Sequence, residues 1–269
     1  MSAPLLVGVV HLPPLPASPR SSLSIAAIAE LVAADAATLT AAGFEGIVVE
    51  NFGDAPFEKG NTLPVTIAAM TRLALEATRA APGLPLGINV LRNDAEAALG
   101  IALAVGAAFV RINVHVGARL TDQGVIEGRA AHTLRARRAM GAEHVGIWAD
   151  VDVKHSAPLA PYPLGQEVED VTKRGLADAV LVTGDGTGKE VDLGKVRTAA
   201  AAAGSKPVYI ASGVAEDSLD AVLGAGARGV IVGSTLRAGG QPGGPIDTVR
   251  ARQFAEAWKT AVARSTRAR

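Results

Sequence analysis

The chain has 269 residues, of which 49% are hydrophobic and 19% charged, and its 26 basic residues balance its 26 acidic ones. This length and apolar content indicate a folded protein with a sizeable core rather than a disordered chain. The zero net charge gives no support for nucleic-acid binding, which needs a basic domain or stripe. Cysteine is absent, which excludes disulfides, thiol catalysis, cysteine–zinc sites and iron–sulfur clusters.

The sequence offers no clear targeting or membrane-spanning segment. Its start has no basic region, and the apolar run at 5–10 is too short for a signal peptide. No uninterrupted apolar stretch reaches about 18 residues, so no transmembrane segment is expected. These features predict a cytoplasmic protein.

Short runs rich in Val and Ile alternate with longer Ala-rich stretches along the whole chain. The predicted strands are 5–10, 46–50, 85–90, 109–114, 145–151, 179–183, 207–211 and 229–233. The predicted helices lie near 23–42, 64–80, 93–105, 128–141, 166–174, 192–203, 216–224 and 246–263. Glycines such as Gly43, Gly106 and Gly141 follow the helical stretches, as expected at helix ends. Eight strand–helix units predict an α/β fold, a single (β/α)₈ TIM barrel over residues 1–269, in preference to an open doubly wound sheet.

Polar side chains gather on the face of the strands that points toward the barrel axis. Side chains alternate between the two faces of a strand, and in 145–153 the odd positions are all apolar. The opposite set should then face the axis near the carboxyl ends of the strands, where barrel active sites lie. This set comprises His11, Glu50, Asn89, Arg111, Asn113, His115, Trp148, Asp150, Asp152, Lys154 and Thr183, with Ser212 at a strand end and His155 just beyond Lys154.

Several buried ionisable groups in one barrel mouth are costly unless they pair or bind something. The candidate catalytic residues are His11, Glu50, His115, Asp150, Asp152 and Lys154, and the candidate substrate-binding residues are Asn89, Arg111, Asn113, His155 and Thr183. Asp150 is favoured as general acid or base because crowding by other carboxylates raises a pKa. A structural ion-pair network is the alternative, with the deeply placed Arg111 paired to a carboxylate such as Glu50.

Two further roles stay open for the charged residues. Lys154 can be a Schiff-base lysine, a phosphate or carboxylate ligand, or an ion-pair partner. A Schiff base needs a depressed pKa, and the carboxylates of Asp150 and Asp152 should raise it, so the ion-pair or ligand role is favoured. The histidines and carboxylates can also hold a divalent metal, although no compact motif such as H-E-x-x-H is present.

The turns after the last two strands predict a phosphate site. Ser212 and Gly213 follow one strand, while Gly233 and Ser234 follow the other. Glycine lets a ligand approach the backbone closely, and these loops are the usual phosphate site of such barrels. Arg237 either adds charge there or faces solvent.

Two other loops stand out. Residues 184–189 resemble a P-loop but fail the motif, because Thr183 stands where its first glycine belongs and Glu190 where Ser or Thr belongs. This segment is either a loop that closes over ligand or a solvent loop. Residues 11–20 contain four prolines, which predict a stiff, extended wall at the barrel mouth.

Five segments together resemble the BtpA/SgcQ family. They are VVHLPPLPASPR at 9–20, GIVVENFGDAPF at 46–57, GINVLRND at 87–94, FVRINVHVGARLTDQG at 109–124 and WADVDVKHSAPL at 148–159, and the likeness continues through VTGDGTG at 182–188 and ASGV at 211–214. The resemblance implies a barrel related to phosphate-binding barrels. It also implies two contexts, since the founding member is a photosystem I biogenesis factor and other relatives resemble members of sugar-utilisation gene sets.

Two functions follow as hypotheses. The first is an enzyme acting on a small phosphorylated sugar or nucleoside-like substrate, with lyase, isomerase and glycosyl hydrolase chemistry all left open. The second is a non-catalytic assembly factor of the photosystem I biogenesis type. The Ala-rich outer helices also make a homo-oligomer an open alternative.

Overall fold

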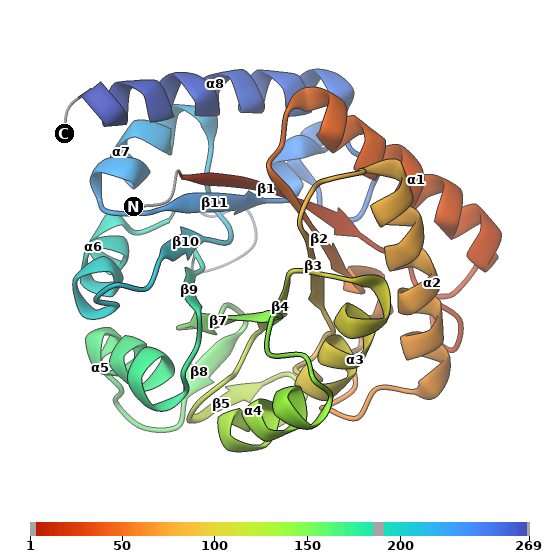
Figure 1. The fold of residues 1–269 in the computed structure, drawn as a ribbon, viewed down its shortest axis with the longest axis horizontal. Helices are drawn as coiled ribbons and strands as arrows, with labels where there is room; N and C mark the ends of the chain where they lie inside the picture. Colours follow the sequence, from red (N-terminus) through yellow and green to blue (C-terminus); the bar gives the residue numbers. More distant parts are fainter. Residues whose placement is uncertain (1–3, 185–190, 268–269) are drawn as a thin grey trace.

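The computed structural model describes residues 4–184 and 191–267. Within these ranges eight parallel strands close into a barrel in the order β1-β11-β10-β9-β7-β4-β3-β2 (Figure 1). The barrel strands are β1 Leu5–His11, β2 Gly46–Glu50, β3 Leu86–Asn89, β4 Phe109–Ile112, β7 Gly146–Val151, β9 Ala179–Val182, β10 Val208–Ile210 and β11 Gly229–Val232. Each predicted strand coincides with one of them, and the predicted (β/α)₈ TIM barrel is confirmed.

Helices surround the barrel and follow the strands in alternation (Figure 1). They are α1 Ile25–Ala42, α2 Pro64–Ala80, α3 Ala95–Val105, α4 Ala130–Ala139, α5 Leu164–Glu169, α6 Leu193–Ala202, α7 Leu219–Gly224 and α8 Thr248–Arg267. Their ends follow local chemistry. Ser24 and Asp94 accept hydrogen bonds from backbone amides in the first turns of α1 and α3, and Gly43 ends α1 in the left-handed conformation.

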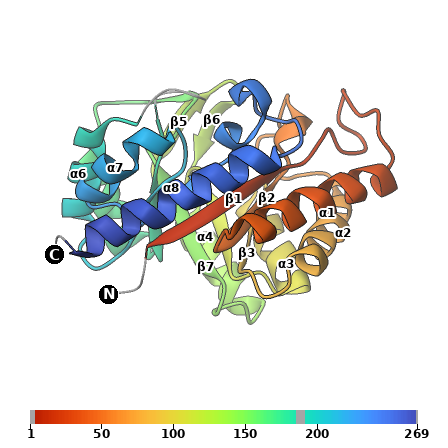
Figure 2. The same ribbon diagram turned by 90° about the horizontal axis from the view of Figure 1, so that it is seen from above.

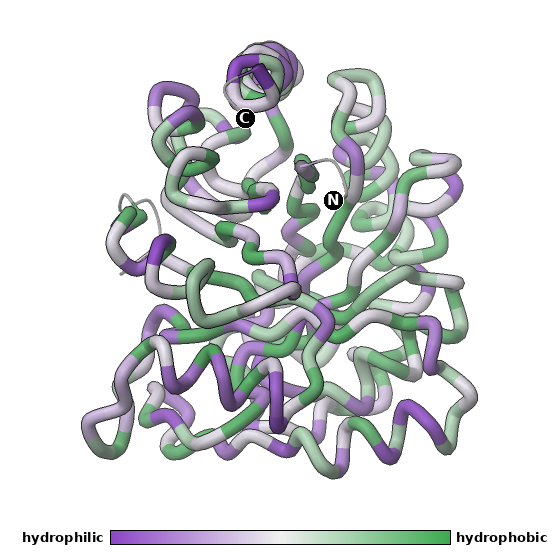
Figure 3. The backbone as a smooth tube through the Cα atoms, turned by 60° about the vertical axis from the view of Figure 1, so that its left-hand side comes forward, coloured by the Kyte–Doolittle hydropathy of each residue, from purple (hydrophilic) through white to green (hydrophobic). Residues whose placement is uncertain are grey.

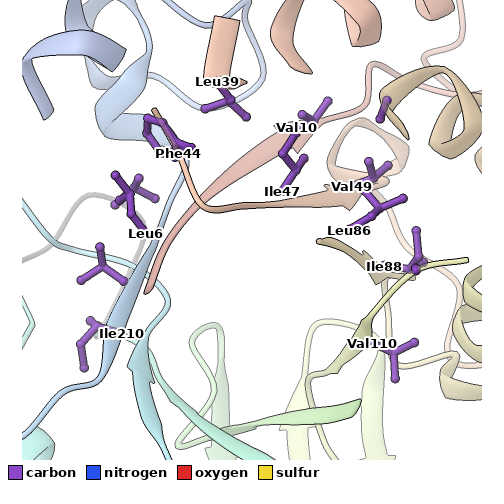
Figure 4. Close-up of a cluster of buried hydrophobic side chains, with 14 of the residues drawn as sticks. Leu6, Val10, Leu39, Phe44, Ile47, Val49, Leu86, Ile88, Val110 and Ile210 are labelled. Atoms are coloured by element: carbon purple, nitrogen blue, oxygen red, sulfur yellow. The ribbon is translucent and has the colours of Figure 1, made fainter. Parts of the chain in front are cut away.

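Alternation along the strands creates two apolar layers. One layer lies between strands and helices, where Val10 and Ile47 meet Leu39 and Phe44 (Figure 4). Hydrophilic stretches lie mainly in the outer helices and connections (Figure 3). The second layer fills the barrel interior and consists of Val7, Val9, Val48, Phe109, Ala179, Leu181, Tyr209, Ala211 and Ile231, with Trp148 packed against it.

The inner layer is closed by stacked aromatic rings. The Phe109 and Trp148 rings stack with centroids 3.6 Å apart, and Tyr209 lies 4.7 Å from Trp148. Phe109 lies over Gly87, where a Cβ atom would collide with its ring. The predicted inward position of Trp148 therefore agrees with the structure, and the polar residues lie above this apolar plug.

Helix α1 is the one helix in the described ranges that is long and apolar enough to cross a membrane by length and composition. In the barrel it packs against α2 and α8, and Figure 2 shows α1 and α8 side by side along β1. Its apolar side chains Ile28, Val32 and Leu39 are buried in the strand–helix core.

A small antiparallel sheet was not predicted. Its strands β6 Gly124–Glu127, β5 Ala118–Thr121 and β8 Ser156–Pro158 come from the connections after β4 and β7. Arg119 anchors it, because its buried guanidinium pairs with Glu167 at 3.0 Å and Asp152 at 3.2 Å. The three strands are short, and the burial in β5 runs opposite to its apolar–polar alternation, since Arg119 is buried and Leu120 is exposed.

Candidate active site

A network of buried polar side chains lies above the apolar plug. The guanidinium of Arg111 donates two hydrogen bonds to Asp150, from Nε at 3.0 Å and from Nη2 at 2.9 Å. Asn113 donates to the same carboxylate at 2.8 Å, and Asn89 donates to Asn113 at 3.3 Å. The predicted convergence of Asn89, Arg111, Asn113 and Asp150 is thus what the structure shows.

The predicted contact between Arg111 and Glu50 is present at 3.5 Å, but Asp150 is the closer partner. Burial opposes the charge of Arg111, yet Asp150 and Glu50 hold the pKa of its guanidinium above the ordinary value. All hydrogen bonds that the Asp150 side chain makes to described residues go to Arg111 and Asn113. Asp150 therefore fixes Arg111, and the geometry does not place it as the free acid or base that was expected.

A pocket opens next to this network at the carboxyl ends of the strands. The space free of protein atoms amounts to about 480 Å³, its open side included. Its polar lining includes His11, Glu50, Arg111, Lys154, Ser212, Gly213, Gly233, Ser234 and Thr235. The pocket therefore brings predicted catalytic residues and the predicted phosphate loops into one cavity.

His11 forms part of the pocket wall. Its ring stacks on Phe52 with centroids 4.4 Å apart. A Cβ atom at Gly233 would lie 3.0 Å from its Cε1, so the glycine leaves room for the ring. Burial, together with Arg237, Lys154 and Arg111, holds the pKa of His11 well below its usual value. Its buried Nδ1 atom has no hydrogen-bond partner in the described structure.

Lys154 differs from the expectation. Asp152 pairs with Lys195 at 2.8 Å and with Arg119 at 3.2 Å, while Asp150 is held by Arg111. Among the described residues the Lys154 ammonium forms no ion pair. Burial and the charge of Arg111 lower its pKa, against the opposing effect of Glu50 and Asp150. The predicted ion pair with Asp150 or Asp152, and the raised pKa, are therefore wrong.

The two loops after β10 and β11 carry unused backbone donors. The amide groups of Gly213, Ser234 and Thr235 donate to no acceptor in the described part of the chain. Gly213 adopts a positive φ of 73°, and Thr235 Oγ1 donates to the Val214 carbonyl at 3.1 Å, which joins the two loops. Free backbone amides at the ends of neighbouring strands are suited to binding an anion, and these three line one pocket.

Arg237 neither faces solvent nor lines the pocket. It is 1% exposed and donates to the carbonyls of Gly233 at 2.6 Å, Val9 at 3.0 Å and Gly244 at 2.7 Å. Asp35 lies 3.6 Å from its guanidinium. Arg237 thus holds the loop after β11 in place from below.

Besides Asn89, Asn113 and Asp150 of the buried network, four more predicted site residues lie outside the pocket lining. The Nε2 atom of His115 lies 2.8 Å from the carbonyl of Gly175, so this side chain contacts the segment before β9. Asp152 and His155 have positive φ angles of 45° and 58°, which end the strand alternation on which their placement rested. The Thr183 hydroxyl lies between the Lys154 amide at 3.2 Å and the Asp152 carbonyl at 3.3 Å, so it positions the loop.

Several residues that line or support the pocket were not among the predicted site residues. Phe52, Thr235 and Pro242 line the pocket, and Arg92 donates to the Lys154 carbonyl at 2.8 Å. The motif GIVVENFGDAPF contains Phe52 two residues after the inward Glu50, which was the available signal. Arg92 and Pro242 had none, because they come from loops whose paths the strand pattern does not define.

The described residues contain no cluster of three or more His, Asp or Glu side chains suited to a metal ion. The predicted mouth wall packs closely, since a Cβ atom at Gly53 would collide with Pro13 and Pro14. The segment 184–189 was predicted to be either a loop that closes over ligand or a solvent loop. Its residues 185–189 lie outside the described residues.

A closed parallel barrel of eight strands that alternate with helices defines a (β/α)₈ TIM barrel. The chain belongs to the BtpA family, whose model matches residues 2–260. It is 45% identical over 252 residues to the photosystem I biogenesis protein BtpA of Synechocystis, covering 94% of this chain and 87% of that protein. A Pyrococcus furiosus protein is 41% identical over 92% of both chains, and a mitochondrial Caenorhabditis elegans protein is 31% identical over 94% of this chain and 92% of its own.

Solved structures with the same fold include phosphate-handling enzymes. Thiamine phosphate pyrophosphorylase from Pyrococcus furiosus aligns with a TM-score of 0.55 at 16% identity, over 97% of this chain and 96% of the enzyme. The N-(5'-phosphoribosyl)anthranilate isomerase of the same organism aligns with a TM-score of 0.53 at 14% identity, over 95% and 99%. At these identities the likeness establishes the fold.

Proposed function

We propose that this protein is an enzyme that uses acid–base chemistry on a small phosphorylated sugar or nucleoside-like substrate. One observation carries the proposal: the amides of Gly213, Ser234 and Thr235, which donate to no acceptor among the described residues, share a pocket with Glu50, His11 and Lys154. An anion site beside titratable groups suits a substrate with a phosphate at one end and a reacting centre at the other.

The roles follow from the positions in the pocket. Ser212, Gly213, Gly233 and Ser234 hold the phosphate. Glu50 is the acid or base, because it lines the pocket and the one hydrogen bond that its carboxylate accepts from a described residue is the long one from Arg111. His11, kept neutral by burial, has one nitrogen to donate and one to accept a hydrogen bond. Asp150 positions Arg111 without touching substrate. Lyase, isomerase and glycosyl hydrolase reactions all fit these roles.

Inorganic phosphate tests the anion site. Because a ligand that binds only the folded state stabilises it, we expect the melting temperature to rise with phosphate concentration. The Ser234→Asp variant places a negative charge at the site and should lose this rise. Ser205→Asp, which adds the same charge at an exposed turn outside the pocket, is the matched control and should keep it. An equal rise in both variants would contradict the proposal.

The 45% identity to the photosystem I biogenesis protein favours a second candidate, an assembly factor. This alternative predicts that the tagged protein retains photosystem I subunits from solubilised Synechocystis membranes. It also predicts that the Ser234→Asp variant retains them equally well, since a scaffold role does not use the pocket. Failure to retain any subunit would contradict it.

Three further points belong to the proposal: a cytoplasmic location is expected, while a homo-oligomer and dependence on a divalent metal are open alternatives. Cell fractionation tests the first and light scattering the second. Turnover after dialysis against a chelator tests the third.

A further inference from the structure

We infer that Lys154 is a nucleophile that forms an imine with the carbonyl carbon of a phosphorylated aldehyde or ketone. The inference rests on the proposed function and names its substrate class. It assigns to Lys154 a bond-forming role in place of the ion pair that its carboxylate neighbours in the sequence suggested.

The first support is the position of the side chain. Lys154 lines the same pocket as Gly213 and Ser234, whose amides have no acceptor in the described ranges of the chain. A molecule whose phosphate is held by those loops therefore shares the cavity with the lysine amine.

The second support is the absence of a competing partner. The neighbouring carboxylates are occupied by other cations: Asp150 by Arg111, and Asp152 by Lys195 and Arg119. Glu50 is in contact with Arg111. In the described structure the Lys154 amine therefore has no ion-pair partner, and the residue lines the pocket.

The third support is that the backbone of Lys154 is fixed although the strand has ended. Its amide donates to Thr183 Oγ1 at 3.2 Å, and its carbonyl accepts from the buried guanidinium of Arg92 at 2.8 Å. Arg92 is 6% exposed. A nucleophile held from both sides is positioned before substrate arrives.

The chemistry uses groups already in the pocket. The groups that act electrostatically on Lys154 are Arg111, Glu50, Asp150 and Arg92, and His11 lines the same wall. Burial favours the neutral amine, whose lone pair attacks the carbonyl carbon. The carbonyl oxygen takes up protons by way of Glu50 and leaves as water, so one C–N double bond replaces one C–O double bond. No oxidant or reductant is required.

Reductive trapping tests the imine. The protein is incubated with glycolaldehyde phosphate, a small phosphorylated aldehyde, and then with borohydride, which reduces an imine to a stable amine. We expect the peptide containing Lys154 to gain the mass of the aldehyde minus one oxygen atom. Lys154→Arg should abolish this adduct. Lys206→Arg should retain it, since Lys206 lies before β10, at the opposite end of the barrel strands, near Asp178.

The outcomes separate this inference from the proposed function. Phosphate stabilisation of Lys154→Arg, together with trapping that is at least tenfold slower with unphosphorylated glycolaldehyde, supports both. If phosphate stabilises the wild type but no adduct forms on Lys154, the imine is refuted and the phosphate site stands. If Lys154 is trapped equally fast with and without the phosphate group, and phosphate does not stabilise the protein, the proposed function fails while the nucleophile stands.

Discussion

Arg111 and Asp150 form the most completely enclosed ion pair in the described structure, with side chains 5% and 0% exposed. Taking both charges out of water is costly, and the pair is tolerated because both partners are hydrogen-bonded. The pair also sets where Glu50 lies, since the same guanidinium contacts that carboxylate. Asp150 thus influences the pocket through Arg111.

Replacing Asp150 by Asn should lower the free energy of unfolding by about 3–5 kcal/mol, because the buried Arg111 charge loses its closest counter-charge and keeps only the longer contact to Glu50. Urea denaturation measures the change. A double variant, Asp150→Asn with Arg111→Met, should recover part of the loss, because it removes the uncompensated charge. A loss below about 1 kcal/mol for the single variant would show that the pair is not the support described.

His11 should make stability depend on pH. The unfolded histidine binds a proton below about pH 6.5, whereas the pKa of folded His11 is held well below that value. Between these two pKa values the unfolded state binds more protons, so the free energy of unfolding falls as the pH is lowered. From pH 7.5 to 5.5 we expect His11 to contribute about 1 kcal/mol of this fall. Urea denaturation of His11→Gln should show a fall smaller by that amount, and an equal fall would contradict the shift.

At the residue scale, strand alternation was sufficient to predict the inward set from Glu50 to Asp150. It failed at Asp152 and His155, because their positive φ angles rotate the chain out of the strand pattern. It also failed at His115, which lies three residues beyond the end of β4 and contacts Gly175 instead. Alternation predicts side-chain direction only while the backbone stays extended.

At the element scale, β3 and β4 depend on a glycine. Gly87 leaves the space that the Phe109 ring occupies, and that ring stacks on Trp148. Gly87→Ala should cost about 1–3 kcal/mol, because the added methyl group overpacks the barrel interior. Trp148 fluorescence should change, since its stacking partner must move.

Gly100→Ala is the matched control for Gly87→Ala. Gly100 lies within α3 and has open space around its Cβ position, so alanine should stabilise the helix by about 0.5–1 kcal/mol. Thermal unfolding compares the two variants. A neutral Gly87→Ala would contradict the tight packing of the aromatic plug.

The small sheet of β5, β6 and β8 shows why some elements escape prediction. Its strands pair across connections from two different units, and its anchor Arg119 reaches Glu167 across 48 residues of sequence. Such pairing depends on how the barrel brings the connections together. Local periodicity carries no information about that proximity.

At the scale of the whole molecule, barrel closure creates the site. The chain places β1 and β11 at opposite ends of the sequence, and closure pairs them, with Gly8 opposite Val232. Arg237 then reaches the Val9 carbonyl across 228 residues and supports the loop of Gly233. Eight repeated strand–helix units were sufficient to predict closure, and hence which loops meet. The ion-pair partner and the pKa shift of each charged side chain could not be predicted without the contacts in the structure, as Lys154 shows.

We propose above all that the loops after β10 and β11 bind a phosphate group facing Glu50 and Lys154. The most direct test is a crystal structure of the protein with inorganic phosphate. We expect the anion within hydrogen-bond distance of the amides of Gly213, Ser234 and Thr235, and no anion there in Ser234→Asp. A phosphate bound elsewhere, with these amides left unoccupied, would contradict the claim.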